Sequence, residues 1–188
     1  CFPNELLDEL IELSKEYNLK IVGHIPQGID PKKYCEYEIS SIEHIDSFIR
    51  GLFSRDDSPA QSFKEVIDIL DSPYLDSLAM NLKRNKIALT PTLVTYENFV
   101  KSAPKEQQAS GYAILRKLNS YTKMFHDSGF QILIGTDYPL SGLSIGDSLI
   151  REMELLIESG LNANEVLLIA IKNSANYLEE SYQIKEGY

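Results

Sequence analysis

Hydrophobic residues along this chain occur in two patterns, short continuous runs and spacings of three to four positions. The continuous runs are rich in apolar and β-branched residues, and they predict four strands at about residues 19–24, 39–44, 87–93 and 130–137. The spaced pattern, typical of one buried helix face, fills the intervals between them. Alternating strands and helices are characteristic of a parallel sheet covered by helices. We therefore expect an α/β fold.

The expected helices have end signals as well as periodicity. Pro73 suits the first turn of a helix, because its fixed φ and missing N–H are tolerated there. Gly129 and Gly160 are suitable residues after a helix C-terminus, and Asn162 or Asn164 is a suitable N-cap. Together these signals predict helices around residues 6–13, 62–70, 74–84, 109–127, 148–158 and 165–178.

Two polar stretches, residues 54–61 and 95–108, follow predicted strands and are expected to be loops. Each contains a proline and several charged residues. Loops in this position form substrate lids in parallel α/β enzymes, and they are also where insertions are tolerated. Both interpretations stay open for these two stretches.

Composition narrows the class of protein. The 188 residues are 43% hydrophobic and 24% charged, which is enough apolar material for one domain with its own core. The formal net charge of −10 disfavours a nucleic-acid backbone or an anionic membrane as partner. No run approaches the roughly 18 apolar residues of a membrane helix. Because no signal peptide is visible, we expect a cytoplasmic protein, the alternative being one whose leader has been removed.

The two cysteines, Cys1 and Cys35, form neither a disulfide framework nor a CxxC or zinc-ribbon spacing. Two free thiols in a reducing compartment are the simplest interpretation. The alternative for Cys1, a lipid-modified N-terminus, requires a signal peptide that the sequence does not show. Since the first residue is not Met, we expect the chain to be cut from a longer one.

Polar residues end three of the predicted strands. His24 ends the first, His44 the second and Asp137 the fourth. Side chains alternate along a strand, so His24 shares a face with Val22, and His44 shares one with Ile42. In a parallel barrel this arrangement places two imidazoles and one carboxylate at the C-terminal rim, where TIM-barrel enzymes hold their catalytic groups. Two His and one carboxylate suit Zn²⁺ or a similar divalent ion.

These residues have a functional and an ordinary interpretation. A bound metal ion lowers the pKa of its water, and a neighbouring carboxylate then accepts the proton. A single histidine at a strand end, however, is more often hydrogen-bonded than metal-bound. The third histidine, His126, is expected at a helix C-terminus, where the helix dipole favours it. Thr92, at the end of the third strand, is either a structural strand residue or a substrate contact.

Several motifs together resemble one family, the amidohydrolase superfamily, and within it the imidazolonepropionase-like metal-dependent hydrolases. The order and spacing of four motifs are similar to those of strands five to eight in that family: Ile21–His24, Ser41–His44, Leu89–Leu93 and Ile134–Asp137. The stretches Ser148–Leu161 and Ala170–Leu178 resemble the helices that follow strand eight. The resemblance runs from about residue 5 to residue 187.

The resemblance implies a TIM-barrel-type, (β/α)₈ hydrolase that cleaves an amide-like or cyclic-amide C–N bond with metal-activated water. By position, His24 and His44 match metal-binding histidines, and Asp137 matches the aspartate that contacts the metal and takes the proton of the water. In some members the residue matching His44 contacts substrate instead, and Thr92 is a further candidate for substrate binding. The implied cofactor is a divalent metal, Zn or else Mn or Fe, and the implied partner is a small-molecule substrate.

The sequence also departs from the family pattern. The strand-one His-x-His pair and the strand-four metal-bridging residue have no counterpart, and Ile150 stands where relatives often carry His. We therefore expect residues 1–188 to form a C-terminal half-barrel, strands five to eight, without the first half and without the family's β-sandwich. A complete barrel typically needs about 250 residues. Because the open edges of a half-barrel invite pairing, we expect self-association or pairing with the missing half.

Three functions follow from this reasoning. The first is part of a metal-dependent amidohydrolase, inactive as this chain alone. The second is a catalytically inert half-barrel or binding domain that keeps only the fold. The third is an unrelated flavodoxin-like sheet that binds a small ligand, in which the strand-end histidines are a coincidence.

Overall fold

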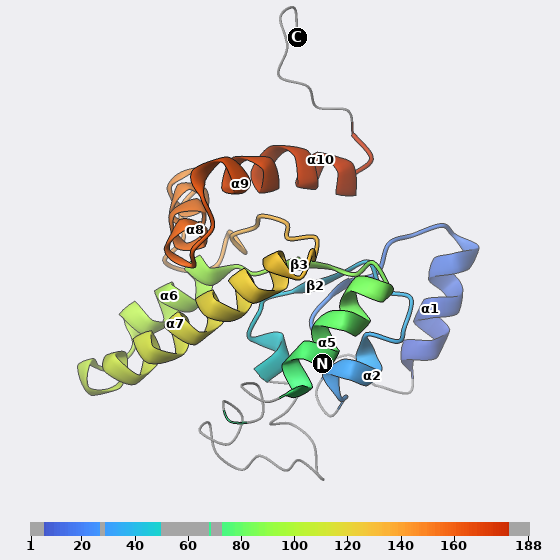
Figure 1. Ribbon diagram of the computed structural model, residues 1–188, viewed down its shortest axis with the longest axis horizontal. Helices are drawn as coiled ribbons and strands as arrows, with labels where there is room; N and C mark the ends of the chain where they lie inside the picture. Colours follow the sequence, from blue (N-terminus) through green and yellow to red (C-terminus); the bar gives the residue numbers. More distant parts are fainter. Residues whose placement is uncertain (1–5, 27–28, 50–67, 69–72, 181–188) are drawn as a thin grey trace, which may run out of the picture. The chain divides into compact units, whose positions relative to one another are not determined.

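The computed structural model describes residues 6–26, 29–49, 68 and 73–180 (Figure 1). The chain divides into two compact units. Residues 1–90 and 127–131 form the first, which we call the sheet unit. Residues 91–126 and 132–188 form the second, the helical unit. Each is described separately below.

The sheet unit contains a small parallel sheet with helices between its strands. Its strands are β1 (Val22–Gly23), β2 (Ser41–Glu43) and β3 (Ala88–Thr90), in the order β1-β2-β3. Its helices are α1 (Leu7–Glu16), α2 (Pro31–Tyr34) and α5 (Pro73–Arg84). All strand pairs are parallel, which confirms the α/β class expected from the sequence.

The register of the strands separates two faces of the sheet. Gly23, Ile42 and Leu89 are aligned with one another, and Ile42 and Leu89 are fully buried. On α5, Leu78 and Leu82 are also inaccessible to solvent. Burying such side chains contributes roughly 1.5–3 kcal/mol each, so this layer is the core of the unit.

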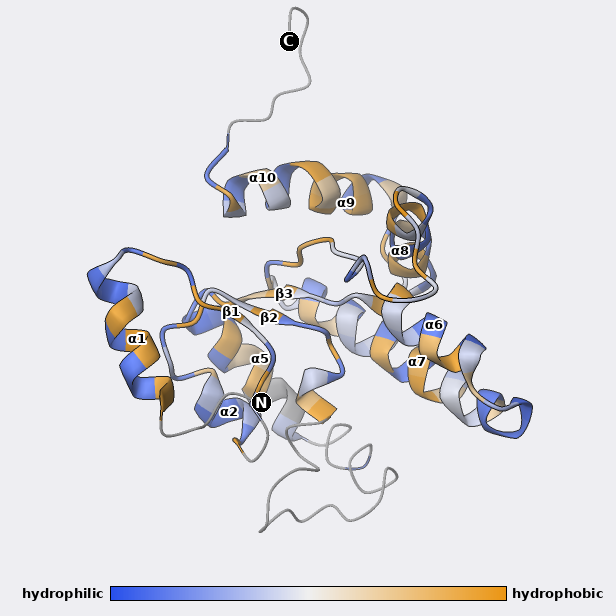
Figure 2. Cartoon of the chain, turned by 180° about the vertical axis from the view of Figure 1, so that it is seen from behind, coloured by the Kyte–Doolittle hydropathy of each residue, from blue (hydrophilic) through white to orange (hydrophobic). Residues whose placement is uncertain are grey.

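Helix α1 has one buried apolar side and one exposed side, as expected for a helix at the protein surface. Leu7 and Ile11 are buried, whereas Leu13 is 44% exposed. Figure 2 shows this as a hydrophobic and a hydrophilic side along the helix. Asp8 and Glu9 in the first turn and Lys15 in the last turn complement the helix dipole.

The helical unit is built mainly of helices. Its elements are α6 (Leu93–Ser102), α7 (Lys105–Asp127), α8 (Asp147–Glu158), α9 (Ala163–Leu168), the π-helix η2 (Ile169–Asn173) and α10 (Ser174–Tyr177). Helices α6 and α7 lie side by side as a hairpin (Figure 1). Gly111 on α7 faces Val100 on α6, where a Cβ would come within 2.8 Å of a Val100 methyl group. The missing side chain therefore permits the close approach of the two helices.

Several expected helices are confirmed. Pro73 begins α5, and α7 and α8 contain the predicted ranges 109–127 and 148–158 almost unchanged. Asn162 is the N-cap of α9, because its side chain accepts from the N–H of Glu165 while the Glu165 carboxylate accepts from the N–H of Asn162. This reciprocal pair is a capping box.

Two predictions about secondary structure are wrong. Residues 95–108 are not a loop, because α6 covers most of this stretch and α7 begins at Lys105. Residues 130–137 are not a regular strand, since only Ile132 is a bridge residue. Beside this bridge, the Gln131 carbonyl oxygen accepts from the backbone N–H of Leu89 on β3 at 3.0 Å.

The predicted helix 165–178 is interrupted by the π-helix η2. There the backbone N–H of Ser174 donates to the carbonyl oxygen of Ile169, five residues earlier, and the Ser174 hydroxyl donates to the same oxygen at 3.1 Å. Such wider turns are uncommon and often occur near functional sites. The predicted helix 62–70 and the polar stretch 54–61 fall outside the described residues, apart from Asp68, which is helical.

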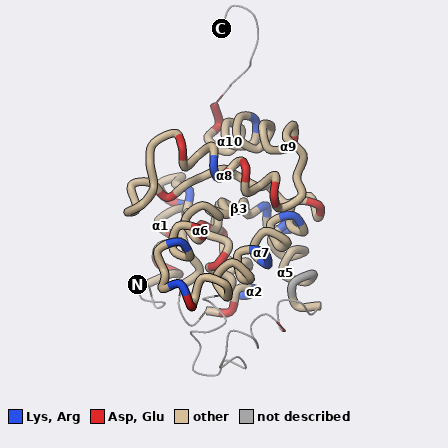
Figure 3. Tube along the Cα trace, turned by 90° about the vertical axis from the view of Figure 1, so that its left-hand side faces the viewer, with Lys and Arg blue, Asp and Glu red and all other residues tan. Residues whose placement is uncertain are grey.

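Acidic and basic positions are interspersed along the described chain (Figure 3). Within the described residues, no helix combines the length and the apolar character needed to cross a membrane.

Candidate functional site

His24 and His44 lie side by side in the sheet unit. Their ring centroids are 4.6 Å apart, and the ring planes meet at 74°. His24 directly follows β1 and His44 directly follows β2, so both come from the carboxyl ends of neighbouring parallel strands. His44 is only 7% exposed, and its N–H donates to the carbonyl oxygen of Thr90 at 2.9 Å. Two of the three predicted metal ligands are therefore neighbours in space.

Regular alternation is not what brings the two histidines together. The register aligns Val22 with Ser41 and Gly23 with Ile42, so His24 and His44 would fall on opposite faces of an ideal sheet. Since the two rings are nevertheless in contact, at least one of the two residues departs from regular alternation. His44 has a φ of 64°, which ends the extended backbone and turns the chain at this residue.

Left-handed backbone is shared by three of the four predicted site residues. His44, Thr92 and Asp137 have φ values of 64°, 50° and 60°. Outside glycine this conformation is uncommon, and for a β-branched residue such as Thr92 it is an outlier that costs on the order of 1–2 kcal/mol. All three follow a strand or a predicted strand. Strain of this kind is concentrated at functional sites.

The other left-handed residues have an ordinary explanation. Asn18, Lys86 and Glu179 each follow the end of a helix. In each case the next N–H donates to a carbonyl oxygen five residues before it, as in Leu19 to Ser14. This is the Schellman arrangement that closes helices. His44, Thr92 and Asp137 lie at no helix C-terminus, so their conformation needs a different reason.

Thr92 and Asp137 belong to the helical unit. Thr92 is the N-cap residue of α6 and is 4% exposed, but its side chain makes no capping hydrogen bond. Asp137 follows Thr136, whose hydroxyl oxygen accepts from the N–H of Tyr138 at 3.3 Å. The Asp137 carbonyl oxygen accepts from the N–H of Leu140, which closes a turn directly after the aspartate.

The backbone that leads to Asp137 is held by side chains. The Asn173 amide donates to the carbonyl oxygen of Ile132 at 3.0 Å, and the Thr95 hydroxyl donates to that of Thr136 at 3.0 Å. Sequence reasoning missed both residues. Asn173 lies at the end of the π-helix, and Thr95 lies on the helix that was expected to be a loop.

A shared metal ion would require the two histidine rings to lie close together. Two imidazoles that share one ion through Zn–N bonds of about 2.0–2.1 Å must lie within a few ångströms of each other. The 4.6 Å between the rings of His24 and His44 meets this condition. Within the described residues of either unit, no group of three His, Cys, Asp or Glu is placed to hold a metal ion. The two imidazoles of the sheet unit therefore lie close together, and no third His, Cys, Asp or Glu among the described residues is placed to complete a metal site with them.

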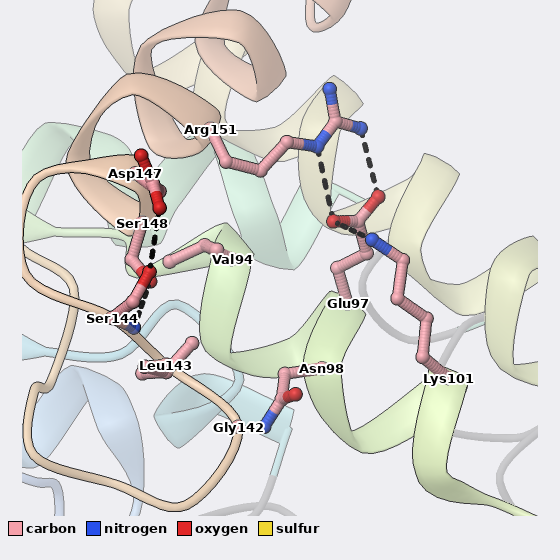
Figure 4. A pocket seen from close by; sticks show the side chains of 10 residues that line it. All are labelled: Val94, Glu97, Asn98, Lys101, Gly142, Leu143, Ser144, Asp147, Ser148 and Arg151. Carbon is pink, nitrogen blue, oxygen red and sulfur yellow. Dashed lines mark hydrogen bonds and ion pairs between the residues drawn. The ribbon is translucent and has the colours of Figure 1, made fainter.

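A pocket of about 180 Å³ lies in the helical unit, between α6, the loop after Asp137 and the start of α8 (Figure 4). Glu97 in its wall is 5% exposed and binds the Arg151 guanidinium through both carboxylate oxygens, at 2.8 and 3.0 Å. Lys101 adds a third contact at 2.7 Å. Burial alone would raise the pKa of Glu97, but the hydrogen bonds from Arg151 and Lys101 outweigh it and lower this pKa. The charges in the pocket therefore neutralise one another.

A buried carboxylate, that of Glu152, was not predicted from the sequence. Glu152 on α8 is fully buried, and its two oxygens accept from the N–H groups of Leu93 and Val94, at 3.0 and 2.7 Å. Burial raises its pKa to about 7, although these N–H groups and the Arg151 charge favour the ionised form. A signal was present in the sequence: Glu152 occupies the same helix stripe as the buried residues Ser148 and Leu155.

Comparison with solved structures shows what this fold is similar to. A bottromycin amidohydrolase matches 96% of the chain with a TM-score of 0.63 at 17% identity. A Xaa-Pro dipeptidase with methionine bound in its active site matches 95%, with a TM-score of 0.62 at 18% identity. A prolidase in complex with N-methylphosphonate-L-proline matches 99%, with a TM-score of 0.63 at 17% identity. No protein-family model and no curated protein matches the sequence.

These matches confirm the resemblance to amidohydrolase-superfamily proteins at the level of the fold. The chain spans less than half the length of the structures it matches, 45%, 38% and 40% of the three in the order given above. It is an α/β chain with a parallel sheet that corresponds to part of an amidohydrolase TIM barrel. At 17–18% identity the likeness establishes the fold, and activity has to be argued from the residues.

Proposed function

We propose that this chain is the C-terminal half of a metal-dependent amidohydrolase barrel, strands five to eight, and that the whole protein hydrolyses a C–N bond. One observation carries the proposal: the imidazoles of His24 and His44 lie 4.6 Å apart at the ends of adjacent parallel strands. The strand ends of a TIM barrel are the place where catalytic residues gather. The left-handed backbone of His44, Thr92 and Asp137 supports the same assignment.

The proposal gives each residue a role. His24 and His44 bind a divalent metal through ring nitrogens, with Zn²⁺ preferred and Mn²⁺ or Fe²⁺ as alternatives. Asp137 supplies the carboxylate that contacts the metal and accepts the proton of the attacking water. Thr92 orients the substrate from the start of α6. When bound, the metal supplies Lewis acidity and lowers the pKa of water.

The substrate class follows from the chemistry and from the matched structures. A carboxylate acting as proton acceptor beside a divalent metal is suited to hydrolysis of an amide or cyclic amide. Two of the matched structures are a Xaa-Pro dipeptidase and a prolidase in complex with N-methylphosphonate-L-proline, so we propose a small peptide-like amide as substrate. Dipeptides that end in proline are the first compounds to assay.

The proposed metal site is tested by metal content. We expect the purified chain to retain about one Zn²⁺ after extensive dialysis, and His24→Ala or His44→Ala to weaken the binding at least about tenfold. His126→Ala is the matched control, because His126 lies in the last turn of α7 and belongs to no proposed site. Equal metal content in the native chain and in His24→Ala would refute the site and favour the inert half-barrel.

Asp137→Asn tests the catalytic part of the proposal in the assembly that hydrolyses its substrate. The change keeps the shape of the side chain and removes the proton acceptor. We expect turnover to fall by about 10²–10⁴-fold with little change in thermal stability. An unchanged rate would exclude Asp137 as the general base.

A partner for the sheet edge is part of the proposal. Within the described residues, β1 pairs only with β2, and Val22 on β1 is 53% exposed. An unpaired edge strand is a template for another strand. We propose that the remaining strands of the barrel, or a second copy of this chain, cover this edge. Light scattering on the purified chain separates the cases, and a monodisperse monomer would refute self-association.

A further inference from the structure

Helix α6 contacts the backbone on both sides of Asp137. The Thr95 hydroxyl donates to the carbonyl oxygen of Thr136, directly before the aspartate. One helical turn further on, the Asn98 amide donates to the carbonyl oxygen of Ser141 at 2.7 Å. Residues three positions apart lie on one face of a helix, so a single face of α6 binds both ends of the segment that carries Asp137.

The position of α6 is itself fixed by a buried carboxyl group. The two oxygens of Glu152 accept from the N–H groups of Leu93 and Val94, which are the first two residues of α6. These N–H groups have no partner within the helix, and the positive end of the helix dipole favours a carboxylate there. Glu152 comes from α8 and therefore fixes the N-terminal turn of α6, one residue after the left-handed Thr92.

The carboxylate of Glu152 takes the place that a capping side chain occupies at the start of other helices. The N-cap residue, Thr92, makes no side-chain capping bond. Thr95 follows Val94 immediately, so a movement of the first turn moves the hydroxyl that binds Thr136. The line of contacts runs from Glu152 to Leu93 and Val94, through Thr95, to the backbone beside Asp137.

We propose that Glu152 is a positioning residue, which acts through the first turn of α6 and Thr95 to set the backbone at Asp137. The catalytic role of Asp137 rests on the proposed function. The mechanical link rests only on the hydrogen bonds within the helical unit. Glu152 itself contacts neither substrate nor metal in this proposal.

The charge of Glu152 makes the link measurable. Arg151 on its own helix and Glu97 on α6 are the charged groups that act on it. Ionisation strengthens the bonds from Leu93 and Val94, because charge-assisted hydrogen bonds are stronger than neutral ones. The amides of these residues should therefore follow the titration of Glu152, whose pKa lies at about 7.

The experiment follows backbone amides of the metal-free chain by NMR across pH 5–9. We expect Leu93, Val94, Thr136 and Asp137 to share one titration in the native chain, and Glu152→Gln to abolish it at all four. Glu154→Gln is the matched control, since Glu154 lies on the same helix, pairs with Arg151 and is 55% exposed. It should leave the titration in place.

Thr95→Val separates positioning from a purely structural effect. The change preserves side-chain shape and removes the hydroxyl that binds Thr136. We expect Leu93 and Val94 to keep their titration, while Thr136 and Asp137 lose it. If the titration of the Thr136 and Asp137 amides were unchanged in both Glu152→Gln and Thr95→Val, the proposal would be overturned.

A metal titration of the same variants connects the link to the site. We expect Glu152→Gln and Thr95→Val to weaken metal binding about tenfold, the size known for residues that orient ligands. Coupled amides with unchanged affinity would show that Glu152 does not position the site. A native chain that binds no metal would refute the proposed function instead, and the amide titrations would still decide the link from Glu152 to Asp137.

Discussion

In the sheet unit, the main chain holds the candidate residue His44: its N–H binds Thr90 on the next strand, at the end of a parallel ladder. In the helical unit, side chains hold the backbone near Asp137. Thr95 donates to the carbonyl oxygen of Thr136, and Asn173 donates to that of Ile132. A ladder is specified by many residues together, because every strand pair contributes to the register. A side-chain bond is specified by one residue and is lost with one substitution.

The largest effect is expected in the cores on which these two regions rest. Leu89 in the sheet unit and Leu155 in the helical unit are both fully buried. We expect Leu89→Ala and Leu155→Ala each to lower the free energy of unfolding by about 2–5 kcal/mol, from lost transfer energy and the cavity left behind. Hydrogen exchange of amides in each unit measures the loss where it occurs.

Exposed leucines provide the control for this pair. Leu19 and Leu167 are 66% and 47% exposed, one in each unit. Their change to Ala should cost well under 1 kcal/mol. If Leu89→Ala cost no more than Leu19→Ala, the core assigned to the sheet unit would be wrong.

The second effect distinguishes the helical unit by its pH dependence. Glu152 has a pKa raised from 4.5 to about 7, so its protonated form is favoured in the folded state. The contribution of Glu152 to the free energy of unfolding is therefore fully present below pH 4.5, and it is lost as the pH rises through 7. The change corresponds to roughly 3 kcal/mol, at 1.36 kcal/mol per unit of pKa.

Urea titrations between pH 4.5 and 8 measure this dependence. The free energy of unfolding should decline in the native chain over that window, and Glu152→Gln should flatten the curve. Glu97 has a lowered pKa, so its contribution is lost only as the pH falls below about 4.5, outside the window. A native curve as flat as that of the Gln variant would show that Glu152 is not buried as a titrating group.

The difference between a strand ladder and a single side-chain bond also explains how much of the fold could be predicted from the sequence. The strands around Val22, Ile42 and Leu89 were identified because continuous β-branched and apolar runs specify a buried parallel sheet. Pro73 and Asn162 were recognised because their effects are local to the next few residues. Patterns that act within a few positions can be found without knowing what the chain packs against.

The candidate site was less predictable, for a physical reason. His24 and His44 were identified from their strand ends, but alternation would have separated them, and the left-handed backbone at His44 cannot be deduced from its neighbours. Residues 95–108 looked like a loop because Pro104 and several charged residues stand there. Thr95 forms its bond to Thr136 across 41 positions, a distance at which no local pattern gives a signal.

The smallest effect tests the contact between α6 and the loop after Asp137. Gly142 and Gly146 have φ values of +88° and +86°, which side chains rarely adopt. A Cβ on Gly142 would also meet the side chain of Asn98, whereas one on Gly146 would meet no atom within 4 Å. Gly146→Ala should therefore cost about 1–2 kcal/mol from backbone strain alone. Gly142→Ala should cost more, because Asn98 must give up its bond to Ser141, and thermal unfolding of the two variants isolates that bond. Equal costs would mean that Asn98 moves aside freely and that Thr95 alone joins α6 to the segment of Asp137.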